Sequence, residues 1–449
     1  MRYLFLLLIT ILTSCQDDGL TPPKPSGSGA TVIVESFTNI PSMEEMVVYQ
    51  VNMRAMSTVG TFKGVQGRLD NIEEMGANVI WLMPIFPVGI EKGINSPYAP
   101  KDYVAVGSEY GTLDDLIRLV NDAHSRDIAV ILDWVGNHTS WDHDWVTNHP
   151  DWYAKDSNGN MIPPPGTNWT DVVELDFTNA DLRAEMISSM QFWLDDAGID
   201  GFRCDAADFL PTSFWTQALN ELNASSDKDL IWLAEGGETS NFTAGFEMNY
   251  AWNFNSAIRN VFSEGSSALS IINTHNQEYA SIPSGGEKLR YITNHDVYAW
   301  ESSVVDDFGT QGSLTAFVIT AYLGGVPLIY DGQEVARPNT INFLINDPID
   351  WSQNASIYNG YAEVMSARKE LSAVQNGDMT SYSTTDVVIF TRSNSQQEVL
   401  VIANVRANQE GITIPTEVAG DWTSAISNES VNLSGELTLD SYEYLILKR

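Results

Sequence analysis

The segment IAVILDWVGNH, residues 128–138, contains the pattern that decides the fold. Residues 128–134 are almost all apolar, which predicts a β-strand that is buried on both faces. The stretch before them predicts a helix, because Thr112 and Asp115 have the spacing of a capping box and apolar residues then recur at helical intervals. A strand buried on both faces needs helices packed around its sheet.

Apolar runs of the same kind recur along the chain, and they alternate with amphipathic stretches such as residues 182–194. This alternation is typical of a parallel sheet with helices on its outside. Eight runs predict a (β/α)8 TIM barrel of the α/β class, with a doubly wound open sheet as the alternative. Besides residues 128–134, the runs are 47–52, 77–83, 199–204, 230–234, 246–250, 289–293 and 326–330.

Two other regions lack this alternation. Residues 138–171 are rich in Trp, Asn, Asp and Pro without a helical period, which predicts a short irregular insertion after the third strand. Residues 376–449 contain short β runs separated by Asn, Ser and Gly turns, which predicts a C-terminal antiparallel β-sandwich. The barrel with its insertion is therefore expected over residues 41–375.

The charge of the chain limits its partners. It has 59 acidic against 23 basic residues, a formal net charge of −36. Nucleic acids and anionic lipid surfaces are bound through clustered Lys and Arg, so both are disfavoured as partners. The charge is compatible with a neutral substrate.

The N-terminal residues predict export and a lipid anchor. Residues 4–12 form an apolar stretch that is too short to span a bilayer, and LTSC, ending at Cys15, resembles a bacterial lipobox. Residues 1–14 are therefore expected to be a lipoprotein signal peptide, with a lipidated Cys15 that holds the protein to the outer membrane. A signal peptide without lipidation is the alternative. Residues 15–40 are expected to be a flexible tether, and Cys204 would be the only remaining thiol.

Three predicted strands are followed by an acid, in the segments GFRCD, LAE and TNHD. The acids are Asp205, Glu235 and Asp296. The carboxyl ends of barrel strands meet at one face, where barrel active sites lie. Retaining cleavage of a glycosidic bond needs a nucleophilic carboxylate and a protonated acid about 5 Å apart. Asp205 and Glu235 follow adjacent strands and are expected to form this pair, while Asp296 stabilises the positively charged transition state.

Charged and imidazole side chains are expected beside these acids. Arg203 lies two residues before Asp205, so it points to the same side of the strand and would hold that carboxylate ionised. His138 and His295 each follow an Asn near a strand end, and we expect both to donate hydrogen bonds to sugar hydroxyls. Asp133 is expected to form hydrogen bonds beneath the site.

These segments, with VVELD at 172–176 and GVPLIYDGQE at 325–334, resemble the alpha-amylase family of glycoside hydrolases, family 13. The resemblance covers the chain from about residue 46 to its end. It implies that Asp205 is the nucleophile, Glu235 the general acid and base, and Asp296 the transition-state stabiliser. It also implies a set of side chains around the reacting glucose, namely Arg203, His138, His295, Tyr98 as a stacking platform and Asp102 as a substrate contact.

Two features of the sequence indicate which kind of alpha-amylase-family enzyme this chain would be. Many endo-acting amylases have Lys-His after the nucleophile segment to bind the leaving-group sugars, and this chain has Asp208-Phe209. The calcium site of the family, where present, uses residues like Asn137 and Glu174. Calcium is thus the cofactor that the resemblance raises, although two ligands fall short of the six to eight oxygens that Ca²⁺ takes.

We therefore expect a retaining hydrolase of α-1,4-glucosidic bonds in starch, glycogen or maltodextrins, acting by double displacement. An exo-acting alpha-glucosidase, a cyclomaltodextrinase and a transglycosylase of the same family stay open as alternatives. A non-catalytic glucan-binding lipoprotein is a further alternative. It is disfavoured because a binding protein has no use for a raised-pKa acid between two carboxylates.

Overall fold

The computed structural model describes residues 32–449. The expected signal peptide, the lipidated Cys15 and most of the expected tether lie outside the described residues. In the part of the chain that is described, no helix is long and apolar enough to cross a membrane.

The centre of the protein is a barrel of eight parallel strands: β1 (Val48–Val51), β2 (Val79–Leu82), β3 (Ala129–Trp134), β6 (Gly201–Cys204), β7 (Ile231–Ala234), β8 (Met248–Tyr250), β9 (Glu287–Arg290) and β10 (Val326–Tyr330). Their spatial order is β1-β10-β9-β8-β7-β6-β3-β2. Because β1 pairs with both β2 and β10, the sheet is closed. The predicted (β/α)8 barrel is confirmed, and the open-sheet alternative is wrong.

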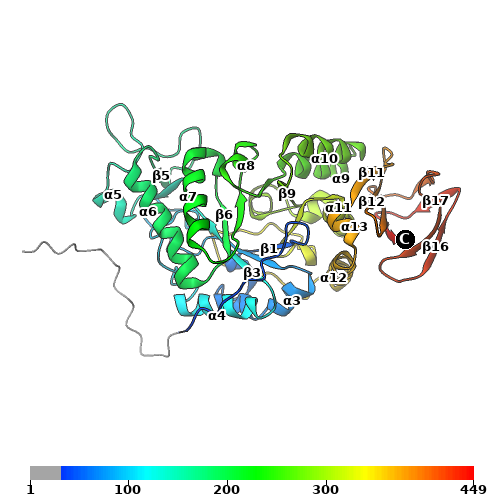
Figure 1. The fold of residues 1–449 in the computed structure, drawn as a ribbon, viewed down its shortest axis with the longest axis horizontal. Coiled ribbons are helices and arrows are strands. Elements are labelled where there is room, and N and C mark those ends of the chain that lie inside the picture. The colour runs from blue at the N-terminus through cyan, green and yellow to red at the C-terminus, as the bar shows by residue number, and fades with distance from the viewer. Residues whose placement is uncertain (1–31) are drawn as a thin grey trace, which may run out of the picture. The chain divides into compact units, whose positions relative to one another are not determined.

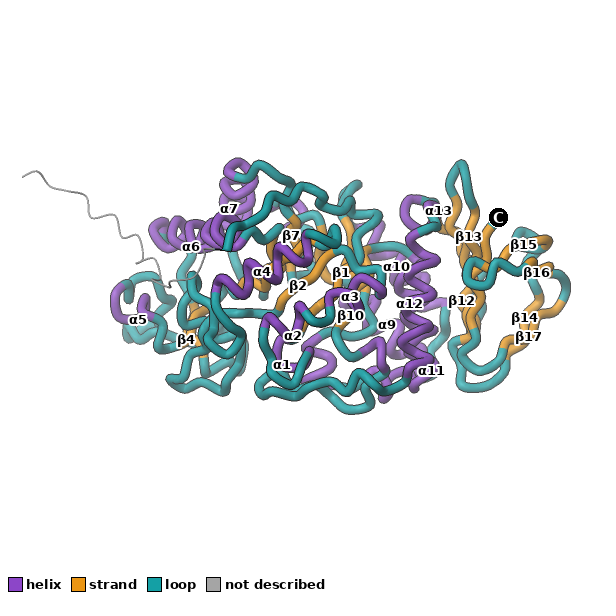
Figure 2. Tube along the Cα trace, turned by 90° about the horizontal axis from the view of Figure 1, so that it is seen from below, coloured by secondary structure: helices purple, strands orange, loops and turns teal. Residues whose placement is uncertain are grey.

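Helices lie on the outside of the strands in both views (Figures 1 and 2). The capping box expected at residue 112 is present, since the Thr112 side chain accepts from the N–H of Asp115 at the start of α4. The helices around the barrel are α1 (Met53–Met56), α2 (Phe62–Gln66), α3 (Leu69–Glu74), α4 (Leu113–His124), α6 (Ala180–Phe192), α7 (Thr212–Ser225), α8 (Ser240–Ala244), α9 (Trp252–Ser263), α10 (Leu269–Ser281), α11 (Val304–Leu323), α12 (Ala355–Lys369) and α13 (Ser372–Asn376). Short π or 3-10 turns are η1 (Trp193–Ala197), η2 (Ala207–Phe209), η3 (Val297–Glu301) and η4 (Gln333–Val335).

The chain segment before β1 closes the amino-terminal end of the barrel. Phe37, Ile40 and Met43 pack against the first residues of several strands, such as Val48 and Val79. The carboxyl ends of the strands, which precede the expected catalytic acids, therefore lie at the opposite end of the barrel.

Two sequence predictions are wrong in detail. The run at residues 289–293 was expected to be a strand, but β9 spans Glu287–Arg290, so the segment TNHD lies in the loop after it. Buried Lys288 and Arg290 interrupt the apolar pattern, which explains why the pattern places this strand too late. The insertion is also less irregular than expected. It contains α5 (Asp144–Asn148) and β4 (His138–Ser140), and β4 pairs antiparallel with β5 (Val172–Glu174), which directly follows the insertion.

The expected C-terminal antiparallel β domain is confirmed. Its larger sheet has the order β11 (Asp378–Ser381), β12 (Val387–Ser393), β13 (Glu398–Asn404), β18 (Tyr444–Lys448), β15 (Gly420–Ser424) and β16 (Ser430–Leu433). A second sheet pairs β14 (Glu410–Thr413) with β17 (Glu436–Leu439). An apolar core of its own fills the domain. The Arg392 side chain donates to the main-chain carbonyl of Leu323 in α11 at 2.8 Å, which ties the larger sheet to a barrel helix.

Candidate active site

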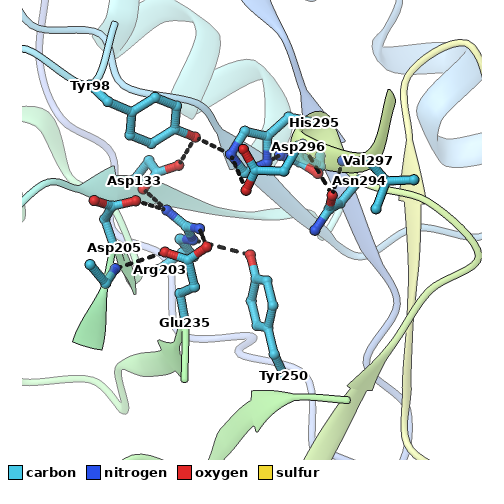
Figure 3. Close-up of polar contacts among 12 residues, drawn as sticks. Tyr98, Asp133, Arg203, Asp205, Glu235, Tyr250, Asn294, His295, Asp296 and Val297 are labelled. Carbon is cyan, nitrogen blue, oxygen red and sulfur yellow. Dashed lines mark hydrogen bonds and ion pairs between the residues drawn. The ribbon is translucent and has the colours of Figure 1, made fainter. Parts of the chain in front are cut away.

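A fully buried arginine on β6 stands at the centre of the site and contacts three carboxylates (Figure 3). Arg203 Nη1 lies 2.7 Å from Asp133 Oδ1 and 2.7 Å from Asp205 Oδ1, and Nη2 lies 2.8 Å from Glu235 Oε1. Its Nε donates to the hydroxyl of Tyr250 at 3.2 Å. One rigid guanidinium therefore fixes carboxylates from three neighbouring strands, β3, β6 and β7, relative to one another.

The carboxyl groups of Asp205 and Glu235 both have raised pKa values. Burial raises the pKa of both, and Arg203 opposes that rise. The negative charge of Asp133 further raises the pKa of Asp205, and that of Asp205 raises the pKa of Glu235, so the two pKa values are about 6 and about 7. The pKa of both carboxyls is thus raised, and that of Glu235 is the higher, which suits the acid of the pair.

The backbone after Asp205 supports the Glu235 side chain. Ala206 has φ +45° and ψ +41°, in the left-handed region that is costly for a residue other than glycine. In this conformation the Ala206 N–H donates to Glu235 Oε2 at 2.7 Å. Ala206 directly follows Asp205, the expected nucleophile, and its N–H binds Glu235, the expected acid. This strained residue therefore connects the two.

The third acid, Asp296, comes from the loop after β9. Its side chain is 48% exposed because it faces the open pocket. Burial of the surroundings and the negative charge of Glu235 raise the pKa of Asp296 to about 7. Asn294 fixes this turn, since its Oδ1 accepts from the N–H of Asp296 at 3.1 Å and from that of Val297 at 3.0 Å.

Tyr98 and His295 belong to a hydrogen-bonded chain that ends on Asp133. The Tyr98 hydroxyl donates to Asp133 Oδ2 at 2.9 Å, so it accepts from Nε2–H of His295 at 2.7 Å. His295 Nδ1 accepts from the Gln50 side chain at 2.8 Å. Burial, with a contribution from Arg203, holds the pKa of His295 well below its usual range, so the imidazole is neutral. The Tyr98 and His295 rings stack 5.3 Å apart and line the pocket.

Two of the expected substrate contacts are placed differently. His138 lines the pocket, but its Nε2–H donates to the main-chain carbonyl of Tyr98 at 3.0 Å and is not available to a sugar hydroxyl in this arrangement. Burial lowers the pKa of His138 to about 4. Asp102 does not line the pocket, and its Oδ1 accepts from the N–H of Val104 at 2.9 Å. Here His138 supports Tyr98, and Asp102 stabilises its own loop.

The acids open into a pocket of about 720 Å³, a size that suits a small ligand or part of a chain. Its rim is aromatic, and several large rings there are exposed to solvent. Such rings offer flat apolar surfaces on which a sugar ring can stack. They are Trp169, Phe209, Trp252 and Trp300, with Phe343 in the wall.

The pair Asp208-Phe209 lies in η2, between the Asp205 segment and the loop after Glu235. Both oxygens of Asp208 already accept hydrogen bonds, one from that loop and one from α8. Phe209 is 54% exposed, and its ring stacks on that of Trp169 with centroids 5.9 Å apart. This side of the pocket therefore offers an apolar platform where many endo-acting amylases have a basic pair.

The two residues expected at a calcium site supply only part of a ligand shell. The Asn137 amide lies 3.4 Å from Nδ1 of His138, and the buried Oε2 of Glu174 has no hydrogen-bond partner. Across residues 32–449, no group of three or more His, Cys, Asp or Glu is placed to hold a metal ion. Because Ca²⁺ takes six to eight oxygen ligands, this donor set does not fit it.

Sequence reasoning missed several side chains that shape the site, among them Gln50, Tyr250, Trp252 and Trp300. Gln50 carries a signal that could have been used, since it is a polar residue inside an apolar strand and is completely buried. The two tryptophans carry none, because a loop or helix-start position does not reveal which cavity it borders.

The chain is similar to known proteins over most of its length. The family model described as "Alpha amylase, catalytic domain" matches residues 35–409. Alpha-amylase MalA of Haloarcula japonica is 24% identical over 443 residues, which cover 92% of this chain and 64% of that protein. Alpha-amylase 3 of Dictyoglomus thermophilum is 24% identical over 481 residues, which cover 91% and 94%. The solved structure of a noncanonic maltogenic alpha-amylase, AmyB of Thermotoga neapolitana, superposes with a TM-score of 0.80 at 25% identity, covering 91% of this chain and 99% of that one.

Proposed function

Because this chain belongs to the alpha-amylase family of glycoside hydrolases, we propose that it hydrolyses α-1,4-glucosidic bonds of starch, glycogen or maltodextrins with retention. Asp205 is the nucleophile, Glu235 the general acid and base, and Asp296 the stabiliser of the transition state. The observation that carries the proposal is that one buried guanidinium, that of Arg203, contacts the carboxylates of both Asp205 and Glu235 at the ends of neighbouring strands.

This pair suits a retaining mechanism. An inverting enzyme needs its two carboxyls about 6.5–9.5 Å apart to admit a water molecule, whereas a retaining enzyme needs about 5 Å. Asp205 Oδ1 lies 2.7 Å from Nη1 of Arg203 and Glu235 Oε1 lies 2.8 Å from Nη2, so one guanidinium holds the two carboxyls close together, as a retaining pair requires. The ionised member is the nucleophile, and the protonated member is the acid.

Two chemical steps follow from this arrangement. The Asp205 carboxylate attacks the anomeric carbon while Glu235 gives its proton to the glycosidic oxygen, so the leaving sugar departs as an alcohol. Glu235, now ionised, then takes a proton from water, whose oxygen attacks the same carbon and frees Asp205. The two inversions give net retention. The negative charge of Asp296 stabilises the positive charge that develops on the sugar ring.

The pocket supports a neutral sugar as substrate. Among the described residues, no Lys or Arg lines it, so it offers no cation for a phosphate or carboxylate group. The exposed aromatic rim offers stacking surfaces instead. Without the basic pair on the leaving-group side, short maltodextrins should be preferred over long chains, with early release of glucose or maltose.

Product analysis tests both the reaction and its pattern. Starch, pullulan, a cyclodextrin and maltoheptaose would be digested, and the products of the first few per cent separated by thin-layer chromatography. A broad early ladder with a rapid fall in viscosity would contradict the preference for short chains. Faster attack on the cyclodextrin would favour a cyclomaltodextrinase, and products longer than the substrate a transglycosylase. A folded protein that cleaves none of them would leave a glucan-binding role.

We also propose that the chain is a lipoprotein anchored at Cys15 to an outer membrane. The lipobox-like LTSC and the polar sequence after it support this anchor. The fold is compatible with it, because the segment before β1 lies at the barrel end opposite the acids. Metabolic labelling with a fatty acid should mark the wild type and not Cys15→Ser. Equal labelling of both, or none of either, would reject the anchor.

A further inference from the structure

The loop that carries Glu235 is fastened to the segment that carries Asp205. Asp208 Oδ2 accepts from the N–H of Gly237 at 2.8 Å, and Asp208 Oδ1 accepts from Nδ2 of Asn241 at 3.0 Å. Gly237 lies two residues beyond Glu235, and Asn241 lies in α8. We name these two hydrogen bonds the acid-loop clamp.

The acid-loop clamp is tightly packed and is supported from the other side. A Cβ on Gly236 would lie 2.3 Å from Asp208 Oδ1 and 2.4 Å from Asn241 Nδ2, so only glycine fits there. The carbonyl of Gly236 accepts from the N–H of Tyr250 at 3.0 Å. The loop after Glu235 is therefore held between Asp208 and β8, and its position depends on both.

We propose that Asp208 is a positioning residue, which holds Glu235 at the distance from which it protonates the glycosidic oxygen, and is not a substrate contact. The inference rests on the proposed function, because it takes Glu235 as the acid. Asp208 borders the pocket, yet both its oxygens already accept hydrogen bonds, one from the loop and one from α8. Two of the roughly four lone-pair sites of this carboxylate therefore hold the segment after Glu235 in place, which is a use within the protein that needs no substrate.

The inference predicts an effect that depends on the leaving group. A misplacement of about 1 Å can cost about 100-fold in rate, so Asp208→Ala should lower kcat/KM on maltooligosaccharides by about 10- to 100-fold. Fluoride leaves without protonation. With α-maltosyl fluoride the loss in kcat/KM should therefore be less than about threefold. KM for maltooligosaccharides should change little.

Three further variants test whether Asp208 acts by positioning Glu235. In Asp208→Asn the amide oxygen can accept from Gly237 N–H and the amide nitrogen can donate to a flipped Asn241, so most of the lost activity should return. Gly236→Ala disrupts the acid-loop clamp from the opposite side and should show the same dependence on leaving group. Asp227→Ala, which removes an exposed carboxylate before β7, should behave as wild type. Circular dichroism and melting curves report whether each variant folds.

Different results would reject the positioning role of Asp208 and the proposed function. Equal losses of Asp208→Ala on both substrates would overturn a positioning role. A KM that rises with the length of the leaving-group chain would overturn it too, because that result marks a substrate contact. If the wild type cleaves neither substrate, the proposed function fails, and with it the assignment of Glu235 as the acid on which the inference rests.

Discussion

Replacing Arg203 with methionine removes the charge that three buried carboxylates share and keeps an apolar side chain of similar length. Leaving a buried charge without its partner costs about 3–5 kcal/mol in free energy of unfolding. Three unpaired carboxylates do not triple this cost, because they can take up protons instead. Burial already raises the pKa of Asp133 and Asp205 to about 6 and that of Glu235 to about 7 while Arg203 lowers all three. Without the guanidinium, all three pKa values move further upward.

The loss of stability in Arg203→Met should therefore depend on pH. A carboxyl whose pKa is higher in the folded than in the unfolded protein binds more protons when folded, so stability falls as pH rises between the two pKa values. We expect a loss of about 3–5 kcal/mol near pH 8. The loss should be clearly smaller near pH 5, where the three carboxyls of the folded variant are protonated.

Activity should fall as well, because a protonated Asp205 is not a nucleophile. We expect a loss of about 1000-fold or more in kcat/KM near neutral pH, with the acidic limb of the pH profile moved to higher pH. Arg203→Lys is the matched control, since it keeps the charge but lacks the planar fork, and it should be less impaired. Urea unfolding at both pH values and kcat/KM profiles measure these effects. A stability loss that is equal at pH 5 and pH 8, or wild-type turnover by Arg203→Met, would refute the reasoning.

Three further predictions concern the acids and the metal. Glu235→Gln should lose more kcat/KM on starch than on an aryl α-maltoside, whose leaving group needs little protonation, and equal losses would show that Glu235 is not the acid. Asp296→Asn should abolish hydrolysis but stabilise the protein increasingly between about pH 4 and pH 7, because the raised pKa of Asp296 destabilises the folded state over that range. A stability difference that does not change with pH in urea unfolding would contradict this. Chelation with EDTA should leave the melting temperature and activity unchanged, since Asn137 and Glu174 do not form a Ca²⁺ shell, and a lower melting temperature restored by Ca²⁺ would reveal a site.

The pairing of the acids could be predicted because it depends on topology. Asp205 and Glu235 each follow a strand, and in a parallel barrel the ends of β6 and β7 must be neighbours. The C-terminal β domain could be predicted for a similar reason, since short β runs and turns leave a local signal. Where polar residues are buried within a strand, as Lys288 and Arg290 are in β9, the signal misleads.

The hydrogen-bond partners of individual side chains could not be predicted. The imidazole of His138 donates to the carbonyl of Tyr98, which is 40 residues away, and no local pattern records that contact. The same holds for Asp208, whose identity suggests a weakened sugar contact but whose oxygens accept hydrogen bonds from the loop after Glu235 and from α8. Roles of this kind depend on distances between segments, and only the folded chain supplies them.

Trapping the covalent intermediate tests the central claim most directly, that Asp205 is a nucleophile and Glu235 its acid and base. In Glu235→Gln, α-maltosyl fluoride can still form the glycosyl-enzyme because fluoride needs no proton, whereas hydrolysis lacks its base. Intact-protein mass spectrometry should show one added maltosyl group per chain, peptide mapping should place it on Asp205, and Asp205→Asn should abolish it. Fluoride release by Glu235→Gln without any adduct, or an adduct on another residue, would contradict the account.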